Sequence, residues 1–164
     1  IWNMNKLLIL LIVLIGSIQS INGQYISDNT LGLRFGDNDG LGGELTYQRK
    51  MALQSRIELN LGYRNHKSYD AFKFTGIYQW VWTIDERLNW YVGLGGGLGS
   101  WSYSKGLNNN DDGLFINADG NIGIEYDFKS PILISLDFRP EFEVLGEYGR
   151  DPDLDIAMSF RYQF

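Results

Sequence analysis

The segment LDIAMSFRYQF, residues 154–164, decides the fold class of this chain. Each even position in it carries a large apolar side chain, and each odd position carries a polar or small residue. Successive side chains of a β-strand point to opposite faces of the sheet. The segment therefore predicts a strand with one wholly apolar face and one polar face.

The same period of two extends back through the chain as far as residue 29. Seven further segments alternate in this way, at 31–36, 41–48, 56–64, 72–84, 90–99, 116–128 and 132–144. Ile77 and Val81 break the alternation, and Pro140 on the apolar face predicts a bulge or bend. Short connections make adjacent strands antiparallel. We therefore expect an all-β fold of eight antiparallel strands, each of about 9–11 residues.

Composition excludes several classes of protein. The 164 residues include 14 basic and 20 acidic side chains, which give a formal net charge of −6. The longest basic block is the dipeptide Arg49-Lys50, so nucleic acid is not an expected partner. The absence of cysteine excludes a disulfide framework, a thiolate metal site, a cysteine nucleophile and a lipoprotein anchor.

Residues 1–23 have the organisation of a secretory signal peptide. Lys6 precedes an unbroken apolar run from Leu7 to Ile15, and small or weakly polar residues follow it. This run is shorter than the roughly 20 apolar residues that a membrane-spanning helix needs. We predict cleavage near Gly23, which leaves residues 24–164 as the barrel domain. An uncleaved N-terminal anchor is the alternative.

An exported meander of eight strands has two physical solutions. A soluble lipocalin-type barrel turns its apolar face inward around a ligand, whereas a membrane barrel turns that face outward to lipid. Glycines at 93, 95, 97 and 99 on the polar face favour the second solution, because they weaken a solvated strand but relieve crowding in a narrow lumen.

The polar face also carries charges of both signs, which suits a cross-linked interior. From it we predict a lumen charge network of Arg34, Glu44, Arg56, Glu58, Arg64, Glu125, Asp137, Arg139, Glu141 and Arg161. Lys73, Asp119, Asp127, Glu143 and Asp155 lie on the same predicted face.

Aromatic residues gather toward the two ends of the predicted strands. Bands of aromatic rings at both water–lipid boundaries are typical of transmembrane barrels. With the N-terminus on the periplasmic side, the tight joins at 50–54, 85–88 and 129–131 are periplasmic turns. The predicted aromatic girdle consists of Tyr47, Trp80, Trp82, Trp90, Tyr126 and Phe128 near these turns, with Tyr63 toward the opposite rim.

The end of the chain also carries a family resemblance. Ile156-x-Met158-x-Phe160-x-Tyr162-x-Phe164 resembles the C-terminal signal of bacterial outer-membrane proteins, and residues 24–164 resemble a small OmpX/OmpA-type eight-stranded barrel. The resemblance implies that the barrel-assembly machinery reads Phe160, Tyr162 and Phe164. It also implies a monomer in the outer membrane of a Gram-negative bacterium, in contact with outer-membrane lipid and lipopolysaccharide.

The sequence does not predict a catalytic or cofactor site. Its one histidine, His66, shares a predicted loop with Ser68 and Asp70. A catalytic triad needs side chains that converge from a rigid frame, so a lipid A-modifying enzyme is the weaker alternative. The glycine run at 93–99 lacks the Lys-Ser/Thr of a phosphate-binding loop. Four loop acids, Asp111, Asp112, Asp151 and Asp153, lack the spacing of a calcium loop.

The predicted function follows from this geometry. Eight strands enclose an interior just wide enough for side chains, so a general porin is not expected. We predict a non-enzymatic outer-membrane barrel that serves envelope structure or surface interaction through loops 65–70, 105–113 and 146–153. A secreted lipocalin-like carrier of a hydrophobic ligand is the alternative.

Overall fold

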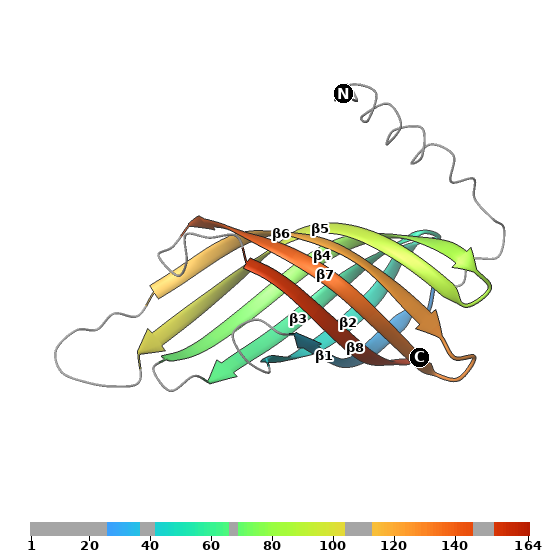
Figure 1. The fold of residues 1–164 in the computed structure, drawn as a ribbon, viewed down its shortest axis with the longest axis horizontal. Coiled ribbons are helices and arrows are strands. Elements are labelled where there is room, and N and C mark those ends of the chain that lie inside the picture. Colours follow the sequence, from blue (N-terminus) through green and yellow to red (C-terminus); the bar gives the residue numbers. More distant parts are fainter. Residues whose placement is uncertain (1–25, 37–41, 66–68, 104–112, 146–152) are drawn as a thin grey trace, which may run out of the picture.

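The computed structural model describes residues 26–36, 42–65, 69–103, 113–145 and 153–164. These residues form eight strands that run obliquely around one barrel (Figure 1). The strands are β1 (Asn29–Gly36), β2 (Gly42–Ala52), β3 (Ser55–Asn65), β4 (Tyr69–Asp85), β5 (Leu88–Tyr103), β6 (Gly113–Asp127), β7 (Ile132–Leu145) and β8 (Asp153–Gln163). Within these ranges, the structure contains no helix of the length and apolarity needed to span a membrane.

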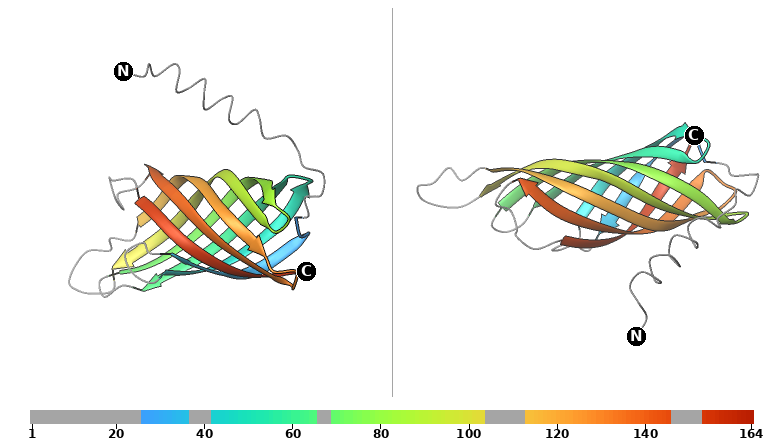
Figure 2. Two further views of the ribbon diagram at one scale, coloured as in Figure 1. Left: turned by 45° about the vertical axis from the view of Figure 1, so that its right-hand side comes forward. Right: turned by 90° about the horizontal axis from the view of Figure 1, so that it is seen from above.

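Each strand pairs antiparallel with its neighbour in sequence, and β1 pairs with β8 to close the barrel. Just beyond the β1–β8 ladder, the backbone of Asn29 donates to Phe164 (N···O 3.1 Å) and accepts from it (3.0 Å). Closure gives each strand a hydrogen-bonded neighbour on both sides and removes the exposed edges of an open sheet. Figure 2 shows the continuous wall from two further directions. The predicted eight-stranded antiparallel barrel is confirmed.

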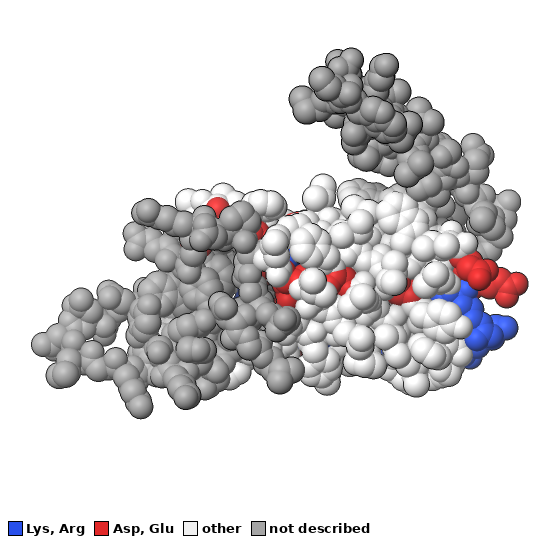
Figure 3. Space-filling view, in the orientation of Figure 1, with Lys and Arg blue, Asp and Glu red and all other residues white. Residues whose placement is uncertain are grey.

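The polar face of the strands points inward. Among the described residues, 21 polar or charged side chains are buried, against 8 apolar ones. The large apolar side chains are on the outside. The face drawn in Figure 3 is mostly uncharged, apart from charged residues at one end and some acidic atoms near its middle. Along β6, burial alternates without a break from Leu114 to Asn121, in step with the sequence. The lipocalin-type alternative, which needs an apolar interior, is therefore wrong for these strands.

Four strands are longer than the predicted 9–11 residues. β4, β5, β6 and β7 contain 17, 16, 15 and 14 residues, whereas β1 has only 8. The β4–β5 ladder continues to the pair Tyr69–Tyr103, through Asp70 opposite Ser102. These polar positions look like loop in the sequence, but backbone pairing continues past them because it does not depend on apolar side chains. One side of the barrel wall is consequently taller than the other.

Pro140 does not produce the predicted bulge. It pairs with Leu154 in the regular β7–β8 register. On the other side, the β6–β7 ladder has no pair between Asp119–Glu141 and Ile122–Phe138, where the proline ring lies over Gly120. A Cβ on Gly120 would lie 3.1 Å from Cγ of Pro140, so the glycine leaves room for the ring and the strand continues. The β6–β7 ladder shifts register instead between Ile116 and Asn117, nearer the ends of both strands.

Candidate functional site

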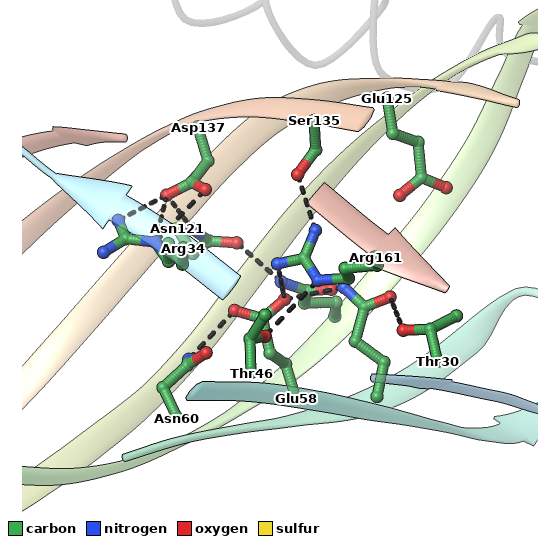
Figure 4. Close-up of polar contacts among 12 residues, drawn as sticks. Thr30, Arg34, Thr46, Glu58, Asn60, Asn121, Glu125, Ser135, Asp137 and Arg161 are labelled. Carbon is green, nitrogen blue, oxygen red and sulfur yellow. Dashed lines mark hydrogen bonds and ion pairs between the residues drawn. The ribbon is translucent and has the colours of Figure 1, made fainter. Parts of the chain in front are cut away.

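The lumen holds a connected set of charged and amide side chains, which we call the lumen network. Each of the eight strands contributes to it, because each places every second side chain inside the barrel. Figure 4 shows part of the network, with side chains from opposite walls meeting near the axis. Three hydroxyl residues also belong to it, so its members are Thr30, Arg34, Glu44, Thr46, Gln48, Arg56, Glu58, Asn60, Gln79, Asn89, Asn121, Glu125, Ser135, Asp137, Arg139, Asp155 and Arg161.

Glu58 on β3 is the centre of the lumen network. Its carboxylate forms ion pairs with Arg139 of β7 (3.3 Å) and Arg161 of β8 (3.1 Å). It also accepts hydrogen bonds from Asn60 (2.9 Å), Gln48 (2.7 Å) and Gln79 (3.1 Å). The side chain is 1% exposed, so these five donors replace the water that a carboxylate would otherwise bind.

A second centre is Arg34 on β1, which contacts three carboxylates. Its guanidinium lies 2.6 Å from Asp137, 2.6 Å from Asp155 and 3.3 Å from Glu44. Arg139 lies 3.1 Å from the same oxygen of Glu44 and also pairs with Glu58. Arg139 therefore joins the two centres into one network that crosses the lumen.

Arg56 and Glu125 form a bidentate pair nearer the tight turns. The two N···O distances are 2.7 and 3.1 Å, and Nε of Arg56 donates to Gln79 at 2.7 Å. The guanidinium carbon also lies 5.0 Å from the ring centre of Tyr91, within the range of a cation–π contact. Tyr91 packs in turn with Val81 and Ile26, and these three residues form an apolar cluster beside the charged network.

Glycines on β5 and β6 make room for large side chains in the lumen. Tyr91 lies directly opposite Gly123, where a Cβ would come within 2.5 Å of its ring. Phe115 lies opposite Gly99, and its ring occupies the space that a side chain would take there. Of the four predicted glycines, Gly99 leaves room for an aromatic ring, whereas a Cβ on Gly93, Gly95 or Gly97 would lie 3.0 Å or less from backbone or other side chains of β4 and β6.

Of the ten predicted lumen charges, nine have described side chains, and all nine lie on the inward face. Eight of them belong to the lumen network, and Glu141 pairs with Lys73 at 2.5 Å in a separate contact. The backbone of Arg64 lies on β3, but its side chain is outside the described part of the structure. The predicted set of charges does not include the amides of the network, Gln48, Asn60, Gln79, Asn89 and Asn121. Their positions on the polar face of the alternating strands could have predicted that they point into the lumen.

The predicted girdle residues near the tight turns lie on the outer face and form ring contacts. Trp82 stacks on Trp90 with ring centres 4.7 Å apart, and Tyr126 meets Phe128 edge to face at 4.8 Å. Trp80 contacts Tyr78 at 5.1 Å, and the hydroxyl of Tyr47 donates to Asn29 at 2.7 Å. Tyr63 lies opposite Phe72 toward the other end, and both are about half exposed.

The loop residues considered for catalysis or cation binding lie elsewhere. His66, Ser68, Asp111, Asp112 and Asp151 are outside the described residues, as are most of the three predicted loops. The described backbone includes Asp70 and Asp153, but not their side chains. Within the described part of the chain, no three His, Cys, Asp or Glu side chains are gathered as a metal centre.

The fold is that of the small outer-membrane β-barrels. No protein-family model and no curated protein sequence matches this chain. Among solved structures, the N-terminal barrel domain of OprF from Pseudomonas aeruginosa matches with a TM-score of 0.67 and 10% identity, over 84% of this chain and 98% of that one. Neisserial surface protein A (NspA) matches with a TM-score of 0.64 and 10% identity, over 83% and 94%.

A third match is Ail, the attachment invasion locus protein of Yersinia pestis. Its TM-score is 0.58 at 14% identity, over 84% of this chain and 97% of Ail. The predicted resemblance to small OmpX/OmpA-type barrels is thus confirmed at the level of the fold. Because the identities are low, these structures establish the fold and not the activity.

Proposed function

We propose that this chain is an integral protein of the outer membrane of a Gram-negative bacterium, and that its barrel is a closed, non-enzymatic scaffold for surface-exposed loops. The observation that carries this proposal is the inverted distribution of polarity, with a charged interior inside an apolar wall. A soluble protein has the opposite arrangement, because the hydrophobic effect removes apolar side chains from water.

The apolar wall is suited to lipid contact. Leu33, Leu45 and Ile124 lie on three different strands, and each is between 45% and 48% exposed. Soluble monomers rarely expose apolar patches larger than a few hundred Å². Here such side chains occur on every strand, with aromatic rings toward the two ends. This pattern is what a transmembrane barrel presents to the hydrocarbon layer and its two interfaces.

The filled lumen supports a scaffold rather than a porin. Arg34, Arg56, Arg139 and Arg161 are each at most 2% exposed and extend into a barrel of only eight strands. Open aqueous channels are found in barrels of about 16–18 strands. A molecule that crosses this lumen would have to separate several buried ion pairs, so we expect no general diffusion of solutes.

A surface role draws its support from the fold matches. NspA is named as a surface protein, and Ail is named for attachment and invasion. In the present chain, the working surface proposed for such a role is the end of the barrel opposite the tight turns, where the chain enters the predicted loops. Outer-membrane lipid and lipopolysaccharide are the proposed surroundings of the wall.

The last strand is the proposed assembly signal. Phe160, Tyr162 and Phe164 lie on the outer face of the barrel with exposures of 45%, 56% and 61%. Tyr162 and Phe164 stack with ring centres 6.3 Å apart. An exposed aromatic strand of this kind can be read from outside the barrel by the assembly machinery, which is the role that the family resemblance implies.

The proposal is tested by expressing the whole chain in a Gram-negative host and separating its membranes. We expect the protein in the outer-membrane fraction and a gel mobility that changes on boiling, because a closed ring of backbone hydrogen bonds resists SDS. Mass spectrometry of the same sample tests cleavage near Gly23. A soluble protein whose mobility does not depend on heat would contradict the proposal.

A further inference from the structure

Asp119 on β6 differs from the other carboxylates buried in the lumen. Its exposure is 3%, yet no Arg, Lys or His side chain of the described residues lies within ion-pair distance of it. The other buried acids all have such a partner: Glu58, Glu125, Asp137 and Asp155. A buried carboxylate without a counter-charge is costly, so this one calls for an explanation.

Two side-chain oxygens here, one of Asp119 and one of Asn117, accept no hydrogen bond from the described residues. Oδ1 of Asp119 accepts a hydrogen bond from the side-chain amide of Asn117, but Oδ2 has no partner. Asn117 is 6% exposed, and its own carbonyl oxygen, Oδ1, has no partner either. Buried acceptors are nearly always satisfied, by protein groups or by bound water and ions. Two oxygens without a hydrogen-bond donor, at neighbouring inward positions, therefore indicate a binding site for a cation.

The neighbouring strands add further oxygen atoms to this place. Gly97 of β5 lies opposite Asn117, and a Cβ there would lie 2.7 Å from Oδ1 of Asn117 and 3.0 Å from Oγ1 of Thr75. The absence of a side chain at Gly97 lets the side chains of Asn117, Thr75 and Lys73 come together over it. Across the other ladder, Glu141 of β7 lies opposite Asp119. Carboxylate, amide and hydroxyl oxygens from three strands, β4, β6 and β7, thus lie in one part of the lumen beside Gly97 of β5.

Lys73 is the cation that interacts most strongly with the charge of Asp119, but it forms its ion pair with Glu141. Its ammonium pairs with Glu141 at 2.5 Å, and only its Cε carbon approaches Gly97, at 3.0 Å from the Cβ position. The two carboxylates and one ammonium carry a formal charge of −1. One further small cation would compensate the charge of Asp119 and use the two unsatisfied oxygens.

We propose that Asp119, Asn117, Thr75 and Glu141 form a binding site for a small, hard metal cation in the half of the lumen away from the tight turns. The donors are all oxygens, which favour Na⁺, K⁺, Mg²⁺ or Ca²⁺ over softer metals. Affinity for such cations rises with the number of carboxylates. With two carboxylates, and Lys73 close by, the site belongs to the weak class, with dissociation constants of about 0.1–1 mM or above.

The test is the cation dependence of barrel stability. The folded protein in a zwitterionic detergent is titrated separately with NaCl, KCl, MgCl₂ and CaCl₂, at an ionic strength held constant with choline chloride. Urea unfolding is followed by the heat-dependent gel shift. For at least one cation we expect saturable binding. Once its concentration exceeds the dissociation constant, a tenfold rise in concentration should raise the folding equilibrium constant about tenfold.

Three variants decide the origin of that response. Asp119→Asn should abolish it and should raise stability in choline chloride, because it removes an uncompensated buried charge. Asn117→Asp adds a carboxylate and should shift the response to lower cation concentrations. Asp127→Asn, at the other end of β6, should leave the response unchanged. The proposal is overturned if no cation differs from choline, or if Asp119→Asn responds as the unaltered protein does.

Discussion

Replacing Glu58 by glutamine tests whether the lumen network holds the barrel together. The substitution keeps the size of the side chain and removes one charge from a site that is 1% exposed. Each of its two arginine contacts, at 3.1 and 3.3 Å, corresponds to about 5 kcal/mol of Coulomb attraction at an effective dielectric constant of 20. The desolvation cost of Glu58 itself offsets much of this attraction, since that cost also disappears in the variant.

The two arginines are affected unequally. Arg139 keeps a second carboxylate, Glu44, whereas Arg161 keeps only the hydroxyls of Ser135 and Thr46. The variant therefore leaves one buried guanidinium without a counter-charge, and we expect a loss of about 3–5 kcal/mol in the free energy of unfolding. The assay is reversible urea unfolding in lipid vesicles, followed by tryptophan fluorescence and by the gel shift.

A double variant separates charge pairing from packing. Arg161→Met removes the stranded charge, so we expect the Glu58→Gln/Arg161→Met protein to be more stable than the sum of the two single changes predicts, by at least about 1 kcal/mol. Glu141→Gln is the matched control, because it breaks the pair with Lys73, which shares no hydrogen-bond or ion-pair partner with Glu58 among the described residues, and it should add independently to Glu58→Gln. The reasoning is refuted if Glu58→Gln costs less than about 1 kcal/mol, or if Glu58→Gln and Arg161→Met are additive.

Three further changes probe other parts of the wall. Gly32→Ala should prevent closure of the barrel, because its Cβ would overlap a backbone carbonyl of β8. Gly43→Ala has open space around it and should fold normally. The two variants are compared by the fraction of protein that shows the heat-dependent gel shift. Leu94→Arg, in the middle of β5 on the outer face, should cost about 2–4 kcal/mol in vesicles, and Leu53→Arg in a tight turn much less. Equal losses would contradict a lipid-facing wall. Tyr91→Phe should be neutral or stabilising in urea unfolding, because the buried hydroxyl has no hydrogen-bond partner, and a loss above about 1 kcal/mol would show that one exists.

The alternation of side chains made the strands and their orientation predictable. In residues 154–164, one face is apolar and the other polar, so only two orientations are possible. The glycines on the polar face of residues 90–99 favour a narrow lumen, and the apolar face is then the one that meets lipid. Ile77 and Val81 look like errors in that alternation, yet both are fully buried on the inward face. They are apolar members of a mostly polar interior, and Val81 packs against Tyr91. Binary patterning has no means of distinguishing such residues from outward ones.

The pairing inside the lumen was not predictable from the sequence. Arg34 and Asp137 are separated by 103 positions and lie on β1 and β7, so their contact depends on how far the strands are staggered around the ring. Glu58 meets side chains from four other strands for the same reason. The sequence shows which residues face inward, whereas the stagger determines which of them touch. The bulge predicted at Pro140 is absent for a similar reason. The room for the proline ring is provided by Gly120 on another strand, which the local sequence does not indicate.

Because β1 pairs with β8, the closed barrel has no first or last strand in space, and the chain could in principle begin at any of its turns. The hydrogen bonds between Asn29 and Phe164 bring the first and last strands as close as any two strands joined by a turn. A circularly permuted chain, with a short linker across this seam and new termini in the turn at Leu53, would contain the same eight ladders. If the permuted chain still folds, its last strand is β2, so the aromatic sequence at residues 160–164 lies in its interior. Comparing the assembly of the two chains in cells would show whether that sequence must stand last in order to be recognised.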